Sequence, residues 1–145
     1  MKAEYFLPVV VAVLVTAVGC GEERFKIVPV SGVVTIDGEP IAEAYVNFQP
    51  QTTGEDGLAG MGSFGRTDSA GRYELMTIKR EPGAVVSSHR VKIQTQLSKD
   101  ASDGSRKIVV RKEMLPTRYH SESELTFEVP LGGTDQANFE LTTNK

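Results

Sequence analysis

The chain has 145 residues, a length that suits a single domain. Its net charge of −3 and its lack of tryptophan exclude a general nucleic-acid binder, which needs a basic surface. The single cysteine, Cys20, excludes an intrachain disulfide and a cysteine metal cluster.

The first segment, residues 1–19, has the pattern of a secretory signal. Lys2 is followed by an apolar run from Tyr5 to Val18, which is too short to cross a bilayer comfortably. A charged start followed by a short apolar core is typical of a signal peptide rather than of a folded element. We therefore expect residues 1–19 to lie outside the fold.

The run ends in Gly19-Cys20, and this junction resembles the bacterial lipoprotein signal. In that signal a small residue precedes a cysteine, which is lipidated and becomes the new N-terminus. Ala17 stands where leucine is usual, and Glu4 weakens the positive start. We expect a lipoprotein signal peptide over 1–19, a lipid on Cys20 and a tether over 20–29. Cleaved soluble secretion and a retained anchor are the alternatives.

From Val30 onward apolar residues recur at every second position, which is typical of strands with one buried face. No segment has the period of a long helix. We therefore expect an all-β fold, a seven-stranded antiparallel β-sandwich over residues 30–145. The predicted strands are 30–36, 43–49, 60–67, 72–76, 88–97, 124–129 and 136–142. The predicted core is Val34, Ile36, Val46, Phe48, Tyr73, Leu75, Val91, Ile93, Phe127, Phe139 and Leu141.

Glycine-containing turns separate the predicted strands. Asp37-Gly38 is a strong signal for a tight two-residue hairpin, and Gly132-Gly133 is expected to close the last hairpin. Two connections are longer, 50–60 and 98–112. Within the second, Lys-Ile-Val-Val-Arg at 107–111 is expected to form a short edge strand, with its basic ends guarding against unwanted pairing.

The segment Asp68-Ser69-Ala70-Gly71 has two interpretations. Asp68 can accept a hydrogen bond from its own backbone two residues on, and Gly71 supplies a positive φ, so a hairpin turn is the favoured interpretation. Calcium is the alternative, but it requires six to eight oxygen ligands. Further ligands would have to come from Glu55, Asp56, Asp100 and Asp103.

No pattern in the sequence indicates catalysis or a cofactor. The two histidines, His89 and His120, have no zinc-ligand spacing. We expect His89 to be a packing residue on the apolar phase of its strand, and His120 to lie in a solvated loop. A nucleophile elbow and a phosphate-binding glycine loop are both missing.

Four segments carry a family resemblance. The first two segments are VSGVVTIDGEPIAEAYVNFQP at 30–50 and GRTDSAGRYEL at 65–75. The next two are EPGAVVSSHRVKI at 81–93 and LPTRYHSESELTFEVPLGGTDQANFEL at 115–141. This order resembles the carboxypeptidase-regulatory-like domains of the transthyretin-like, Ig-like β-sandwich group, in particular the small lipoproteins of planctomycete-type bacteria. The resemblance covers about residues 29–142. It implies a seven-stranded sandwich, secretion and usually no enzymatic activity, and it names no ligand.

Together these features predict a non-catalytic envelope lipoprotein, held at the membrane by the lipid on Cys20. It would present the loops 50–60, 77–87 and 98–123, or an edge strand, to a protein partner on the periplasmic or outer side. A carbohydrate- or envelope-binding module is the alternative, with Tyr45 as an outward-facing aromatic residue. A hydrolase of the transthyretin-related type is a remote one, since the chain ends in ELTTNK rather than in that enzyme's Tyr-Arg-Gly-Ser tail.

Overall fold

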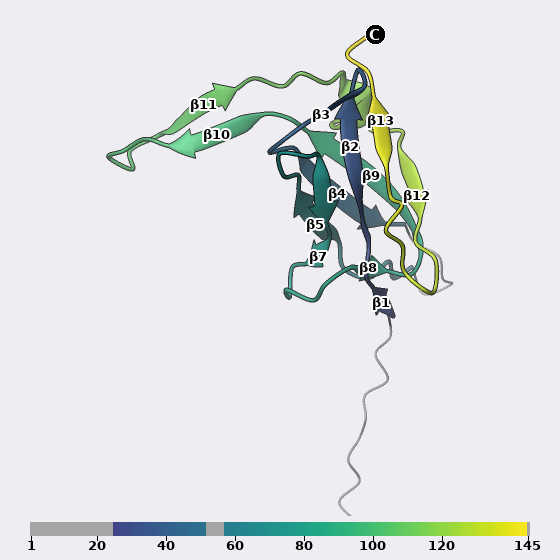
Figure 1. Cartoon of the computed structure of the whole chain (residues 1–145). Coiled ribbons are helices and arrows are strands. Elements are labelled where there is room, and N and C mark those ends of the chain that lie inside the picture. The colour runs from purple at the N-terminus through teal and green to yellow at the C-terminus, as the bar shows by residue number, and fades with distance from the viewer. Residues whose placement is uncertain (1–24, 52–56, 145) are drawn as a thin grey trace, which may run out of the picture.

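The computed structural model describes residues 25–51 and 57–144 (Figure 1). These residues form thirteen strand segments and one short 3-10 helix, η1 (Thr117–Tyr119). In chain order the strands are β1 (Ile27–Val28), β2 (Ser31–Ile36), β3 (Glu39–Pro40), β4 (Tyr45–Pro50), β5 (Ser63–Arg66), β6 (Arg72–Glu74), β7 (Met76–Thr77), β8 (Ala84–Val85), β9 (Ser88–Gln94), β10 (Leu97–Asp100), β11 (Lys107–Arg111), β12 (Thr126–Glu128) and β13 (Phe139–Leu141). For the described residues the prediction of an all-β fold is confirmed.

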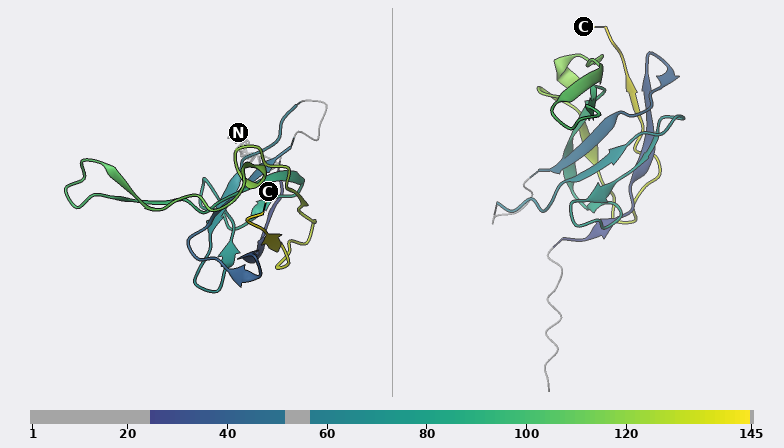
Figure 2. Two further views of the ribbon diagram at one scale, coloured as in Figure 1. Left: turned by 90° about the horizontal axis from the view of Figure 1, so that it is seen from above. Right: turned by 90° about the vertical axis from the view of Figure 1, so that its left-hand side faces the viewer.

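Two main sheets pack face to face. The first has five strands in the order β12-β9-β4-β5-β7, and the second has four, β13-β2-β3 with β6 also paired to β2. Phe48 of β4 and Phe139 of β13 meet edge to face across the interface, with ring centroids 6.1 Å apart. Figure 2 shows the two sheets from two further directions.

Alternation along each strand decides which residues enter the core between the sheets. β2 and β9 alternate between buried and partly or fully exposed positions along their whole length. Ten of the eleven predicted core residues are buried, and Phe127 is partly buried against the same cluster. Phe127 is less buried because its strand, β12, lies at the end of the five-stranded sheet.

One pairing differs from the predicted antiparallel arrangement. β13 lies parallel to β2, with Phe139 opposite Val34 and Leu141 opposite Ile36. The chain reaches this position by crossing from β12, in the other sheet, instead of reversing next to it. The close approach needs Gly32, because a Cβ there would lie 2.0 Å from the Ala137 carbonyl oxygen.

The turn at Asp37-Gly38 is confirmed as a two-residue hairpin. Ile36 pairs with Glu39 across it, and both turn residues have positive φ, 51° and 86°. The mirror-image turn that results matches the twist of the strands. The Asp37 carboxylate also accepts hydrogen bonds from the Thr143 backbone N–H and hydroxyl, so this turn fixes the C-terminal strand.

The turn at Gly132-Gly133 is present, but the predicted hairpin there is wrong. The Gly133 N–H donates to the Pro130 carbonyl at 3.0 Å, and Gly133 has a φ of 75°. The strands on either side, β12 and β13, belong to different sheets. The turn therefore carries the chain from one layer to the other.

Two predicted stretches are divided by the tertiary structure. The predicted strand 72–76 is interrupted at Leu75, because β6 pairs with β2 in one sheet while β7 pairs with β5 in the other. The predicted presenting loop 77–87 contains β8, which pairs with β1 and is buried at Ala84 and Val85. Such divisions give thirteen segments among the described residues in place of the predicted seven strands.

The predicted strand 88–97 also divides, and its second part leaves the two-sheet body. β9 ends at Gln94, and β10 starts at Leu97 and pairs only with β11 among the described strands. Residues 97–112 form a two-stranded hairpin that projects from the body (Figures 1 and 2). The sequence predicts a long connection with one edge strand over 98–112. We call this hairpin the arm, and the other described residues the body.

Candidate functional site

The segment Asp68–Gly71 is a turn. Asp68 Oδ1 accepts hydrogen bonds from the backbone N–H groups of Ala70 and Arg72, both at 2.9 Å, and Gly71 has a φ of 74°. These bonds use the carboxylate to hold the local backbone. The predicted hairpin is wrong in one respect, because the turn joins β5 of one sheet to β6 of the other.

The acidic residues proposed as further calcium ligands do not surround this turn. Asp100 and Asp103 belong to the arm, where Asp103 accepts hydrogen bonds from the Ser105 backbone N–H and hydroxyl. Glu55 and Asp56 lie outside the described residues. Within residues 25–51 and 57–144 no group of three or more His, Cys, Asp or Glu side chains is placed to hold a metal ion.

The two histidines have separate environments. His89 is fully buried in β9, and its Nε2 lies 2.7 Å from the Val85 carbonyl oxygen and 3.2 Å from Ser87 Oγ. Burial lowers the pKa of His89, and its Nδ1 has no hydrogen-bond partner among the described residues. His120 is bonded to the Leu115 carbonyl oxygen instead. His89 is a packing residue, as predicted.

The arm exposes a run of apolar side chains at one of its strands. Ile108, Val109 and Val110 of β11 are 47%, 51% and 55% exposed. In a two-stranded ribbon neither face is covered by a second layer, so successive side chains on both faces meet solvent. Consecutive exposed β-branched residues on a projecting element make this strand a candidate interaction surface.

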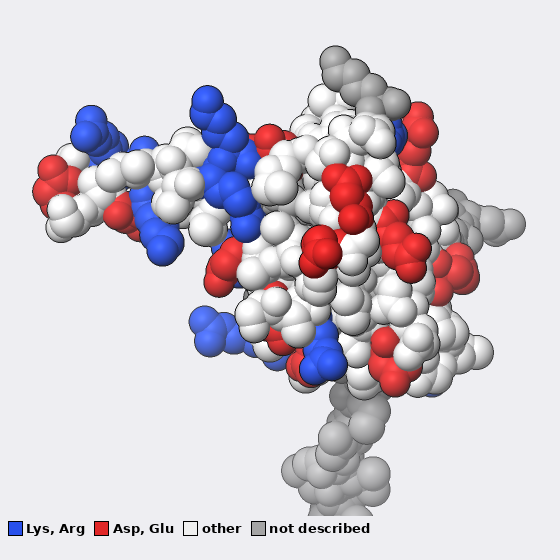
Figure 3. All heavy atoms as spheres, turned by 45° about the horizontal axis from the view of Figure 1, so that its top comes forward, with Lys and Arg blue, Asp and Glu red and all other residues white. Residues whose placement is uncertain are grey.

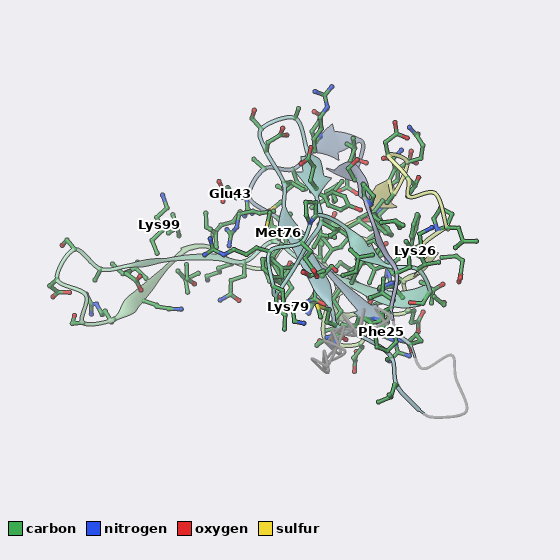
Figure 4. The ribbon with its side chains drawn as sticks, turned by 90° about the horizontal axis from the view of Figure 1, so that it is seen from below. Phe25, Lys26, Glu43, Met76, Lys79 and Lys99 are labelled. Carbon is green, nitrogen blue, oxygen red and sulfur yellow. The ribbon has the colours of Figure 1, made fainter. Side chains whose placement is uncertain are left out.

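Arg111 fixes one strand of the arm to the body. Its Nε donates to the Thr95 carbonyl oxygen at 2.7 Å, and its two terminal nitrogens donate to the carbonyl oxygens of Ala42 at 2.8 Å and Glu43 at 3.0 Å. The planar guanidinium holds these groups in one geometry. In Figure 4 Glu43 lies near the base of the arm and Lys99 lies farther out along it.

Glu113 fixes the C-terminal end of the arm to the residues just before its first strand. Its carboxylate accepts hydrogen bonds from the Thr95 hydroxyl at 2.6 Å and from the backbone N–H groups of Thr95, Gln96 and Leu115 at 3.0–3.2 Å. Burial acts to raise the pKa of Glu113, but the hydrogen bonds from Thr95, Leu115 and Gln96 together outweigh burial and lower it. With Arg111, this network gives the arm a firm base.

The arm and the body differ in charge. The arm has five basic and two acidic residues, a net charge of +3, whereas the body has eight basic and twelve acidic residues, a net charge of −4. Figure 3 shows Lys and Arg along the arm and Asp and Glu over the neighbouring body surface. The basic residues of the arm are Lys99, Arg106, Lys107, Arg111 and Lys112.

Two of the open grooves on the body contain charged or aromatic side chains in their lining. One, of about 560 Å³, lies over β2 and β6 and contains several charged side chains, among them Arg72, Glu74 and Asp135. The other, of about 420 Å³, lies over β4 and β5 and contains Tyr45 and Phe64. The rings of these two residues are nearly parallel, with an interplanar angle of 22° and centroids 6.0 Å apart.

Sequence reasoning found the apolar strand of the arm but not the hairpin or its base. Asp103-Gly104 is the same turn signal as Asp37-Gly38, and it stands between two short strand-like runs. That signal identifies the hairpin. The roles of Arg111 and Glu113 depend on contacts with Thr95, Ala42 and Glu43, which no sequence pattern indicates.

The predicted lipid site, Cys20, lies outside the described residues. Across the part of the chain that the structure describes, no helix has the length and apolar character needed to cross a membrane.

Comparison with known proteins adds little. No protein-family model and no curated protein matches the sequence. A 9R-lipoxygenase from Cyanothece PCC8801 is similar in structure with a TM-score of 0.37 and 10% identity, over 80% of this chain and 16% of the lipoxygenase. This chain therefore spans only a small part of that enzyme's length, and so weak a similarity carries no argument about function.

Proposed function

We propose that this chain is a non-catalytic binding module of the bacterial cell envelope, which uses the arm to dock onto a protein partner. The fold would be a β-sandwich of the carboxypeptidase-regulatory-like, transthyretin-like group, anchored by a lipid on Cys20. The observation that carries the proposal is the exposed apolar run of Ile108, Val109 and Val110 on an arm with a hydrogen-bonded base.

The structure of the arm favours partner binding. An isolated two-stranded hairpin is at best marginally stable in water, so this one depends on its base and on whatever covers its faces. Burial of Val or Ile side chains stabilises a complex by roughly 25 cal/mol per Å² of apolar surface. Because Arg111 and Glu113 already order the base, less entropy is lost when a partner binds.

The charge of the arm defines the chemistry of the partner. Besides Arg111, whose guanidinium is bonded to the body, the arm carries four basic residues, so a complementary surface has an apolar strip bordered by Asp and Glu. The free backbone groups at the edges of β10 and β11 suit the addition of an extended strand from that partner. Pairing between two arms is disfavoured, because each has a net charge of +3.

The position of the arm agrees with an N-terminal anchor. β1 lies at one end of the body and the arm leaves near the opposite end (Figure 1). Phe25, where the described chain begins, is only five residues beyond Cys20. A lipid on Cys20 would hold the β1 end at the membrane and place the base of the arm near the opposite end of the body, where the arm projects sideways. Mass spectrometry of the mature N-terminus tests the anchor, and a Cys20 without lipid would contradict it.

The experiment that tests partner binding places a photo-crosslinking amino acid at Val109 in the native host. The expected result is a discrete crosslinked envelope or secreted protein. Its binding to the purified full chain should weaken as salt is raised, because exposed charge pairs are screened. The double variant Ile108→Ser/Val110→Ser should lose the crosslink.

The matched control is Leu131→Ser, which removes another exposed apolar side chain, 68% exposed, on the turn between β12 and β13. Leu131→Ser should retain the crosslink. The proposal is overturned if no protein is crosslinked above the wild-type background, or if the double variant and Leu131→Ser retain the partner equally.

A further inference from the structure

The groove over β4 and β5 has the dimensions and chemistry of a small-ligand site. Its volume of about 420 Å³ lies within the ordinary range of ligand pockets, roughly 300–1,000 Å³. It is open to solvent on the outer face of the five-stranded sheet, away from the core. Two glycines, Gly60 and Gly62, contribute no side chain to its lining, and Ile78, 71% exposed, stands at its border.

The sheet holds the lining residues on one face. Tyr45, Asn47 and Gln49 occupy alternate positions of β4, so their side chains share the outer face. Asn47 is directly opposite Phe64 of β5, which brings the Phe64 ring next to that of Tyr45. Since β4 is paired on both sides, with β5 and β9, the backbone beneath this face is fixed before any ligand arrives.

The amides on this face offer polar partners to a ligand. Gln49 is exposed, so its side-chain amide can both donate to and accept from a ligand hydroxyl. Asn47 is partly buried, and its Oδ1 is shielded from solvent and accepts no hydrogen bond from any described residue. The groove therefore favours ligands that carry hydroxyl groups.

The lining has no charge. Among the described residues that line the groove, none is Asp, Glu, Lys, Arg or His. The larger groove over β2 and β6 differs, because Arg66, Arg72, Asp68, Glu74 and Asp135 line it. None of the described lining residues of the smaller groove compensates the charge of an ionic ligand, and therefore a neutral ligand fits it better.

We propose that this groove binds a neutral saccharide unit. The apolar C–H face of a sugar ring packs on the aromatic rings of Tyr45 and Phe64, and its hydroxyl groups reach the amides of Asn47 and Gln49. This proposal does not depend on partner binding by the arm. It adds a second binding surface that the module would use on a glycan of the envelope or of its surroundings.

The test uses the purified full chain in a detergent without sugar headgroups. Cellotriose, mannotriose and tri-N-acetylchitotriose are titrated separately, with tri-galacturonate as the charged counter-probe, and binding is followed by isothermal calorimetry and ligand-observed NMR. At least one neutral trisaccharide should bind more tightly than tri-galacturonate. Tyr45→Ala and Gln49→Ala should each raise its Kd, the first by about tenfold or more, which corresponds to about 1.4 kcal/mol.

The control variant is Ile108→Ser, which changes the arm and leaves the groove intact. It should bind the trisaccharide as the wild type does, so failure of the arm proposal and failure of this one are distinguishable. Thermal unfolding checks each variant, and Gln49→Ala decides the outcome if Tyr45→Ala is unfolded, because Gln49 is exposed. The proposal is overturned if no neutral trisaccharide binds at millimolar concentration, or if binding is unchanged in the folded groove variants.

Discussion

β4 and β11 show that the same kind of residue can have opposite surroundings in one chain. Val46 in β4 is fully buried, whereas Val109 in β11 is 51% exposed. β4 has strands on both sides and a second sheet over one face, whereas β11 has, among the described residues, β10 as its single neighbour and no covering layer. The comparison shows that apolar side chains favour burial of a strand, but that the strand is buried only where a second layer covers it. The body and the arm should therefore respond differently to substitution, in four ways that run from the largest expected effect to the smallest.

The largest effect is expected from Phe48→Ala in the body. Phe48 is fully buried and contacts Phe127 and Phe139 at centroid distances of 5.7 and 6.1 Å. Loss of this ring leaves a cavity between the sheets, and the free energy of unfolding should fall by about 3–5 kcal/mol. Urea unfolding followed by circular dichroism measures the change. A loss below about 1 kcal/mol would contradict the assigned core.

An intermediate effect is expected at the base of the arm from Glu113→Gln. The amide replaces one acceptor oxygen by a donor that faces the N–H groups of Thr95 and Gln96. The free energy of unfolding should fall by about 1–3 kcal/mol. Hydrogen exchange should accelerate at residues 97–111 more than in β9. Glu122→Gln is the control, since it removes an exposed carboxylate far from these donors in sequence. Equal acceleration in both variants would show that the arm does not depend on Glu113.

A smaller effect is expected from the buried histidine as pH falls. Burial lowers the pKa of His89 below its ordinary value of about 6.5, so the unfolded chain binds the proton more readily than the folded chain does. The stabilisation from neutral His89 is complete above about pH 6.5 and is lost as pH falls from there through the lower pKa of the folded state.

Urea unfolding at pH 7.5 and pH 5.5 checks this expectation, because Asp and Glu mostly titrate at lower pH. The wild type should be less stable at pH 5.5, and His89→Gln should lose most of that difference. His120→Gln keeps His89 and should retain the difference. If the pH dependence of stability is unchanged in His89→Gln, it comes from groups other than His89.

The smallest effect on stability is expected from Val109→Ser on the arm. Because Val109 is half exposed and packs under no second layer, the free energy of unfolding should change by no more than about 0.5 kcal/mol. The matched substitution in the body, Val46→Ser, buries a hydroxyl and removes core packing, and should cost several times more. Similar losses for the two variants would mean that the arm is covered by the body in solution.

Local chemistry in the sequence determined the strand class and most of the core of this protein. Alternation is a short-range property, so Val34, Phe48, Ile93 and Leu141 could be assigned to the buried face from their neighbours alone. The turn at Asp37-Gly38 was equally local, because its backbone geometry depends on the two residues that form it. The candidate groove was indicated only by the outward phase of Tyr45.

Only the tertiary structure decided how these strands are combined. The parallel pairing of β13 with β2, and the turns at Asp68 and Gly132 that lead from one sheet to the other, depend on which layer each strand joins. The base of the arm joins Ala42 and Glu43 to Arg111, nearly seventy residues later. Apolar run lengths and turn signals carry no information about such distant partners, because the free energy of these contacts arises only when the whole chain has folded around them.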